Sequence, residues 1–136
     1  MSQIGFREFP INRPADELVQ LFKDLPVANI ADNMGRIYCV DAAIKPFSKA
    51  PMLGTAFTVK APLGDNLMFH RALDLARPGD IIVVDGGGGM ERSLCGEIMM
   101  RFAISRNLGG FLIDGCIRDV DAARETDFPI FARGVT

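Results

Sequence analysis

The segment Asp80-Ile81-Ile82-Val83-Val84-Asp85 carries the strongest strand signal in the chain. Its centre is apolar and β-branched throughout, which is typical of a strand buried on both faces in a parallel sheet. A second apolar run, Gly110-Phe111-Leu112-Ile113, predicts a further buried strand that ends at Asp114. A helix is expected between them, from about 94 to 106, so the crossover should be right-handed. The sequence therefore predicts an α/β fold.

The remaining elements follow from hydrophobic periodicity and turn residues. Helices are expected over 15–25, 27–34, 67–76 and 119–124, and strands over 53–60 and 128–133. The first helix would place Leu18, Leu21 and Phe22 on one face, and Gly35 would close the second. Asp65 or Asn66 is expected to cap the helix over 67–76. Nothing obvious in the sequence covers the edge of the last strand.

Length and composition predict one globular domain of the cytoplasm. The chain has 136 residues, of which 49% are hydrophobic, enough for a real core. The net charge is −2 and the basic residues are scattered, which argues against a nucleic-acid partner. The N-terminus lacks the build of a signal peptide, and no apolar run reaches the roughly 18 residues of a membrane span. Three cysteines without C-x-x-C spacing indicate free thiols in a reducing compartment.

Two segments follow the two buried strands and carry the candidate chemistry. They are 85–97, which contains the run Gly86–Gly89, and 114–119, which ends in Arg118-Asp119. Neighbouring parallel strands would bring both to one edge of the sheet, where open α/β folds bind ligands. The glycines allow close backbone approach, and the start of the following helix offers N–H groups to an anion. Arg118 would clamp that anion, and Asp119 would hold a hard divalent cation.

Each of these features alone also has a structural explanation. A glycine run is more often a mobile loop, Arg118-Asp119 can be a surface pair, and Glu97 can be a solvated residue of a first helical turn. The run Gly86–Gly89 is neither a phosphate-binding loop, since no G-K-[ST] follows, nor a dinucleotide fingerprint. The site hypothesis rests on the combination of the two segments.

Histidine and cysteine chemistry receives little support. His70 is the only histidine, and a structural or hydrogen-bonding role is favoured over a catalytic base. One histidine without a cysteine pair disfavours zinc, whereas oxygen ligands favour Mg²⁺ or Mn²⁺. Cys95 and Cys116 have no base partner by spacing and are interpreted as small packing residues.

These residues resemble a known family. Its pattern is present as Gly64-Asp65-Asn66, His70, Pro78–Asp85, Gly96-Glu97 and Asp114-Gly115-x-x-Arg118-Asp119. The resemblance is to the RraA-like family over residues 15–136, with 97–119 as its specific part. That family includes aldolases of 4-hydroxy-4-methyl-2-oxoglutarate and 4-carboxy-4-hydroxy-2-oxoadipate, and regulators of ribonuclease E activity. Some members carry the label demethylmenaquinone methyltransferase.

Two positions separate the two main branches. The aldolase pattern is an acidic residue, then any twenty residues, then Arg-Asp. The regulator pattern has Gly in place of the acidic residue, and a further acidic residue follows two positions after Arg-Asp. Here Glu97 fills the acidic position, and Ala122 stands where the regulators carry an acid. Both differences favour the aldolase branch. A ribonuclease-regulator type of binding protein remains the alternative, and a methyltransferase is the lesser one.

The resemblance implies a layered β/β/α swivelling domain with a central, largely parallel sheet, assembled as homotrimers or hexamers. Asp119 would bind a divalent metal, Mg²⁺ or Mn²⁺, and Arg118 would bind the carboxylate or enolate of the pyruvyl group. The backbone N–H groups of Gly96, Glu97, Ile98 and Met99 would receive the substrate, and Glu97 would position a water or base. Family members usually continue beyond this point, so the single domain 1–136 is expected to lack the family's C-terminal portion.

The expected activity is a metal-dependent (class II) pyruvate aldolase with oxaloacetate decarboxylase side activity, and its partners would be small 2-oxo acids such as pyruvate and oxaloacetate. Cleavage of a 4-hydroxy-2-oxo acid leaves negative charge on the pyruvyl oxygen, which a cation and a guanidinium would stabilise. No lysine falls within 97–119, so a Schiff-base mechanism has little support there.

Overall fold

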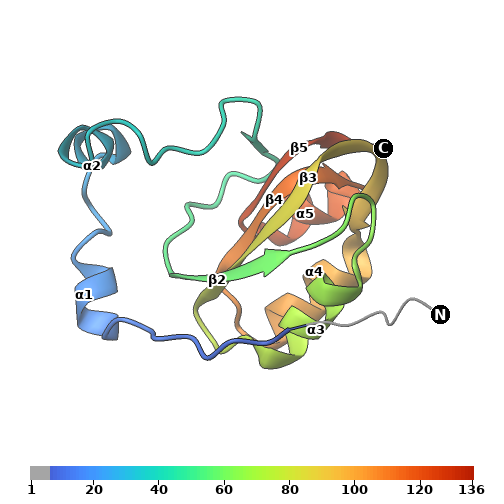
Figure 1. Ribbon diagram of the computed structural model, residues 1–136, viewed down its shortest axis with the longest axis horizontal. Helices are drawn as coiled ribbons and strands as arrows, with labels where there is room; N and C mark the ends of the chain where they lie inside the picture. The colour runs from blue at the N-terminus through green and yellow to red at the C-terminus, as the bar shows by residue number, and fades with distance from the viewer. Residues whose placement is uncertain (1–6) are drawn as a thin grey trace.

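The computed structural model describes residues 7–136. Helices alternate with strands along most of the chain (Figure 1). The helices are α1 (Asp16–Gln20), α2 (Val27–Asn33), α3 (Leu67–Leu75), α4 (Glu97–Ser105) and α5 (Val120–Thr126). The strands are β1 (Lys45–Pro46), β2 (Thr55–Lys60), β3 (Asp80–Cys95), β4 (Gly110–Ile117) and β5 (Ile130–Val135).

The strands form a five-stranded sheet in the order β1-β5-β4-β3-β2. Strands β2, β3, β4 and β5 run parallel, and only β1 pairs antiparallel, against β5. This arrangement confirms the α/β class with a central, largely parallel sheet. It also shows what covers the edge of the last strand, because Lys45 and Pro46 pair with Ala132 and Phe131. A two-residue strand was too short to be found by periodicity.

The core lies between one face of the sheet and the helices α3, α4 and α5, which gather on the same side of it (Figure 1). Val84 and Ile113 stand side by side in register on that face and are fully buried. Phe111 on β4 packs edge-to-face against Phe69 and Phe128, with ring centroids 4.9 Å from each. Such pairs add to the burial of their apolar area. The strand predicted over 80–85 therefore lies at the centre of the core.

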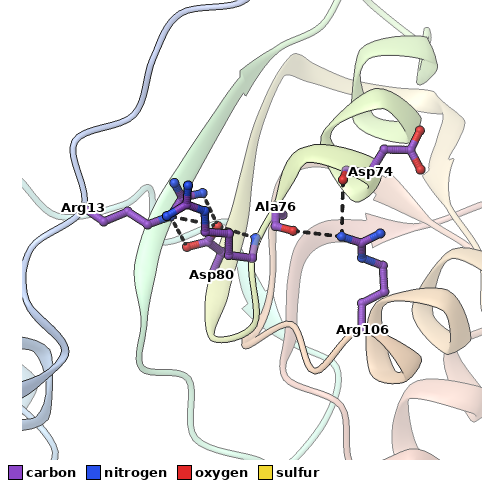
Figure 2. A network of polar contacts seen from close by, with 6 residues as sticks. Arg13, Asp74, Ala76, Asp80 and Arg106 are labelled. Carbon is purple, nitrogen blue, oxygen red and sulfur yellow. Dashed lines mark hydrogen bonds and ion pairs between the residues drawn. The ribbon is translucent and has the colours of Figure 1, made fainter.

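A buried ion pair attaches the N-terminal segment to the start of β3 (Figure 2). Arg13 donates from Nε and Nη2 to the Asp80 carboxylate, at 2.9 and 2.6 Å, and Asp80 is only 2% exposed. The Arg77 backbone N–H donates to the same carboxylate at 2.8 Å. Burial opposes ionisation of Asp80, but the Arg13 fork and the Arg77 N–H outweigh it, and the net effect lowers the pKa of Asp80.

A second arginine lies beside this ion pair (Figure 2). Arg106, just after α4, donates from Nη2 to the carbonyl oxygens of Asp74 and Ala76 at 3.3 Å each. These carbonyls belong to the end of α3, where the last C=O groups lack helical partners and favour a cation. Arg106 therefore joins the end of α4 to the end of α3.

The N-terminal helices differ from their predictions in length and burial. The helix predicted over 15–25 ends at Gln20, and Leu21 and Phe22 are 70% and 42% exposed. The predicted helix over 27–34 is confirmed as α2, which is closed by Gly35 at φ +68°. Figure 1 shows both helices standing apart from the sheet. Neither helix buries a side chain within residues 7–136.

Three boundaries near the site also differ. Strand β3 does not end at Asp85 but runs through the glycines to Cys95, and β4 continues from Asp114 to Ile117. Helix α4 begins at Glu97 and not at about 94. Asp65 Oδ1 accepts the Leu67 N–H at 2.7 Å, so the side chain of Asp65, and not that of Asn66, caps the start of α3. Within residues 7–136, no helix has the length and apolar character needed to cross a bilayer.

Candidate functional site

The carboxyl ends of β3 and β4 meet as the sequence predicted. Cys95 pairs with Ile117, and the next backbone N–H, that of Arg118, donates to the Cys95 carbonyl at 2.9 Å. Gly96 and Glu97 follow one strand, and Arg118 and Asp119 follow the other. The structure therefore brings together the two ends of the 97–119 block that carry the family resemblance.

The side chain of Asp119, the residue before α5, contacts the first turn of α4. Its Oδ2 accepts the Glu97 backbone N–H at 3.0 Å. Gly96 makes this approach possible, because a Cβ atom there would lie 2.6 Å from Asp119 Oδ2 and 2.9 Å from Arg118 Nε. Asp119 also adopts a left-handed backbone conformation, φ 56° and ψ 41°, which aspartate tolerates better than most residues. Such outliers concentrate at functional sites.

Arg118 presents its guanidinium to solvent beside this carboxylate. Arg118 Nε lies 3.6 Å from Asp119 Oδ2, and the two side chains are 66% and 45% exposed. An exposed pair of this kind contributes little to stability. The guanidinium fork therefore keeps donors available for a ligand, next to a carboxylate that is also accessible.

The predicted substrate-binding backbone groups lie at the start of α4, where the first N–H groups have no acceptor inside the helix. Asp119 accepts the N–H of Glu97, and the N–H groups of Ile98 and Met99 lie in the same first turn of α4. The Ile98 side chain is 82% exposed, and the Met99 side chain is buried. In this arrangement an internal carboxylate occupies part of the predicted anion site.

The Glu97 side chain is held along α4. Its Oε1 accepts a hydrogen bond from Arg101 Nε at 2.6 Å, an exposed pair four residues apart. Such pairs are weak and exchange with solvent easily. The backbone N–H of Glu97 thus contacts Asp119 at the site, whereas its carboxylate contacts Arg101 and not Arg118.

The prediction that the four glycines lie in a loop after the strand is wrong. They are part of β3, in which Asp85 pairs with Asp114 of β4 and Gly89 pairs with the next residue, Gly115. The glycines between Asp85 and Gly89 therefore have no partner on β4 and form a bulge. Gly87 and Gly88 have φ of +69° and +72°, so they allow this bulge at little cost. The atoms nearest to a Cβ placed at each of these glycines belong to residues other than Arg118.

The side chain nearest to Gly88 is instead that of Arg133, whose Nε lies 3.4 Å from the position of a Cβ there. Arg133 donates from Nε to Asp114 Oδ1 and from Nη2 to Asp41 Oδ2, the latter at 3.0 Å. Sequence reasoning identified Asp114 but not its partners, because Asp41 is 92 residues from Arg133 and no spacing rule connects them. Two carboxylates neutralise this guanidinium, so it is less available to a ligand than Arg118.

Cys95 and Cys116 are buried packing residues, as predicted, whereas Cys39 is exposed. Burial raises the pKa of the Cys95 thiol far above its ordinary value, and it also raises the pKa of Cys116. Cys116 Sγ lies 3.4 Å from Met90 Sδ. His70 does not have the favoured hydrogen-bonding role: it is exposed on α3, and its side chain has no partner within residues 7–136.

A metal at Asp119 would rely on few protein ligands. No group of three or more His, Cys, Asp or Glu side chains that could hold an ion occurs within the described part of the chain. Zinc, which usually takes three or four protein ligands, does not fit. Mg²⁺ and Mn²⁺ fit better, because Mg²⁺ commonly uses one or two carboxylates and completes its shell with water and substrate oxygens. Asp119 offers one accessible carboxylate for this purpose.

Comparison with known proteins assigns the family. The RraA-like family (Aldolase/RraA) matches residues 27–136, and the chain belongs to it. A protein of Halalkalibacterium halodurans named "Putative 4-hydroxy-4-methyl-2-oxoglutarate aldolase" is 35% identical over 88% of this chain and 58% of its own length. A Hahella chejuensis protein of the same name is 37% identical over 64% of this chain and 52% of its own. The chain thus spans about half the length of these relatives.

Solved structures agree on the fold. A Geobacillus kaustophilus protein, described as an S-adenosylmethionine: 2-dimethylmenaquinone methyltransferase, is 28% identical with a TM-score of 0.72, over 82% of this chain and 70% of its own. Streptomyces coelicolor RraAS2, described as an unusual member of the RNase ES inhibitor RraA protein family, has a TM-score of 0.77 at 24% identity. It covers 93% of this chain and 67% of its own, and this likeness shows the fold alone.

Proposed function

We propose that this protein is a divalent-metal-dependent (class II) pyruvate aldolase. It would cleave 4-hydroxy-4-methyl-2-oxoglutarate, or a related 4-hydroxy-2-oxo acid, and would also decarboxylate oxaloacetate. The observation that carries the proposal is the convergence of Arg118 and Asp119 on the start of α4, with Glu97 N 3.0 Å from Asp119 Oδ2 and Arg118 Nε 3.6 Å from the same oxygen. The names of the relatives support the reaction class.

Arg118 and the helix start would act on the pyruvyl half of the substrate. Breaking the bond between C3 and C4 leaves negative charge on the 2-oxo oxygen, and loss of CO₂ from oxaloacetate produces the same enolate. A guanidinium placed beside that oxygen stabilises the charge as it develops. The N–H groups of Ile98 and Met99 would receive the pyruvyl carboxylate, which the positive end of the α4 dipole favours.

Asp119 would hold the cation, and Glu97 would handle the proton. Mg²⁺ or Mn²⁺ bound there would supply Lewis acidity to the 2-oxo acid. Retro-aldol cleavage also requires a base for the proton of the 4-hydroxyl group. Glu97 is the carboxylate nearest along α4 that could position this base or a water, once its exposed contact with Arg101 opens.

The alternatives receive less support. Ala122, where the regulators carry an acid, is buried on α5, so this chain presents no charge at that point. The glycines of β3 form a bulge inside a strand and do not open a helix, so they offer no cradle for a nucleotide cofactor of a methyltransferase.

We also propose that the protein assembles as a homotrimer or hexamer. Large apolar side chains on and beside α1 and α2 are exposed, among them Leu21, Phe22 and Val27. Such a concentration of exposed large apolar side chains in one segment supports an interface there. Light scattering measures the assembly directly, and a monomer at micromolar concentration would contradict it.

The test of function is pyruvate release measured with lactate dehydrogenase and NADH. Racemic 4-hydroxy-4-methyl-2-oxoglutarate and oxaloacetate serve as substrates, each with Mg²⁺ and with EDTA. We expect metal-dependent turnover of both, above the metal-catalysed background. Absence of turnover by folded protein with Mg²⁺ and with Mn²⁺ would contradict the proposal.

A further inference from the structure

Two adjoining hollows lie beside the candidate site, and neither is lined by Arg118 or Asp119. The larger has a volume of about 510 Å³ and the smaller about 290 Å³. Leu63, Gly64 and Arg92 line both, so the two hollows adjoin between the loop after β2 and the second half of β3. We call the two together the Arg92 hollow.

Arg92 is the cation of this hollow, and within residues 7–136 it has no ion-pair partner. Within residues 7–136 its side chain makes neither an ion pair nor a hydrogen bond, whereas Arg118 and Arg133 both face carboxylates. Its aliphatic part packs against Gly64, where a Cβ atom would lie 2.7 Å from Arg92 Cδ. Close packing of the stem directs the guanidinium to the surface while limiting its freedom. An unpaired, partly fixed guanidinium is suited to a carboxylate.

The other polar groups of the hollow leave this charge available. The Asp65 carboxylate accepts the Leu67 N–H at 2.7 Å, so it is partly used by the start of α3. His70 contributes an imidazole to the larger part, and Glu91 is a second carboxylate, on the smaller part only. Leu63 and Met90 add apolar surface, since both are exposed. The hollow thus combines a cation with a short apolar wall.

Asn66 connects the hollow to the candidate site. Asn66 Nδ2 donates to the Leu94 carbonyl at 3.2 Å and contacts Met99 Sδ at 4.0 Å. Leu94 is two residues before Gly96, and two extended residues span at most about 7 Å. The wall of the hollow therefore lies within roughly 10 Å of the start of α4. With flexible arginine side chains at either end, a five- or six-carbon diacid would bridge the hollow and the start of α4.

We propose that the Arg92 hollow binds the distal carboxylate of the aldol substrate, with Arg92 as the residue that selects dicarboxylic over monocarboxylic 4-hydroxy-2-oxo acids. This rests on the proposed function, in which Arg118 and the start of α4 bind the pyruvyl half. Leu63 and Met90 accommodate a short aliphatic substituent next to that carboxylate. Arg92 is then a specificity residue and takes no part in bond cleavage.

The experiment compares two substrates of one reaction. 4-Hydroxy-2-oxoglutarate carries the distal carboxylate, and 4-hydroxy-2-oxopentanoate has a neutral methyl group in its place. We expect Arg92→Gln to lower kcat/KM for the diacid by about 5- to 10-fold, mainly through KM, because a single exposed charge-assisted contact is lost. The value for the monoacid should change by less than about twofold. Arg36→Gln, on the far α2 segment, makes the same change of charge and should affect neither substrate.

Two further measurements separate binding from structure. Arg92→Lys keeps a point charge and should recover part of the preference for the diacid. Raising the salt concentration should lower the diacid-to-monoacid ratio of kcat/KM in the wild type and leave this ratio unchanged in Arg92→Gln. An unaltered diacid-to-monoacid ratio in a folded Arg92→Gln variant overturns the proposal while the aldolase function stands. If the wild type releases pyruvate from neither substrate, the function fails and this inference fails with it.

Discussion

Replacing Gly96 with alanine tests whether the candidate site depends on close approach between two strand ends. The backbone at Gly96 has φ −141° and ψ −173°, which any residue adopts, so the substitution causes no backbone strain. The new Cβ would lie 2.6 Å from Asp119 Oδ2, and an ordinary contact needs at least 3.4 Å. Asp119 must therefore move by about 0.8 Å, and Arg118 must also give way.

The expected result is a stable protein with a damaged site. The atoms that clash belong to two exposed side chains, which can move without disturbing the core, and loss of glycine makes the unfolded chain less flexible. The free energy of unfolding should change by less than about 1 kcal/mol, or about 2–4 °C in Tm. Misplacement of catalytic groups by about 1 Å can cost about 100-fold in rate, so we expect kcat/KM for pyruvate release to fall by about 10- to 100-fold.

The assay is steady-state pyruvate release, with thermal unfolding of the same preparation as the control. A Gly96→Ala variant with an unchanged Tm and wild-type kcat/KM would refute the reasoning, because the two side chains displaced are those assigned to the enolate and the cation. A large fall in Tm would instead show that these contacts support the fold.

Three other variants give distinct results. Arg118→Gln should lower pyruvate release by about 10²- to 10³-fold if its donor stabilises the enolate, and near wild-type turnover would remove it from the mechanism. Asp119→Asn keeps an acceptor for the Glu97 N–H and tolerates the left-handed backbone, so it should fold but lose its response to Mg²⁺; an unaltered EDTA titration would contradict metal binding there. Arg13→Ala should lower the free energy of unfolding by about 3 kcal/mol at pH 7 in urea titrations. Because the pKa of Asp80 is lowered on folding, this stabilisation exists above its unfolded value of about 3.9 and disappears as the pH falls through the folded value. A difference that stays constant as the pH falls below about 3.9 would contradict the ion-pair origin.

The sheet could be predicted because its central strands are encoded locally. The run 80–85 is apolar and β-branched, so burial on both faces followed directly from its composition. The exposed N-terminal helices also follow local periodicity, although periodicity alone cannot say what covers them. Strand β1 was not predicted, because two residues carry no period and pair with β5 only through the fold.

The site was predicted in part. Arg118, Asp119 and Glu97 meet because their strands are parallel neighbours, which is a rule of topology. The fate of the tetraglycine run could not be predicted from the same rule. Four glycines suit a loop and a bulge equally well, and only the register against β4 decides between them. The Asp41–Arg133–Asp114 contacts are equally non-local and carry no sequence signature.

The pairing of Arg13 with Asp80 has a consequence for how the protein can be shortened. The family match begins at residue 27, yet a buried carboxylate in the first residue of β3 obtains its counter-ion from residue 13. A deletion of the residues before 27 would leave the Asp80 carboxylate buried without its counter-ion. That costs far more stability than removing an exposed tail. The thermodynamic unit thus extends upstream of the region by which the family is recognised.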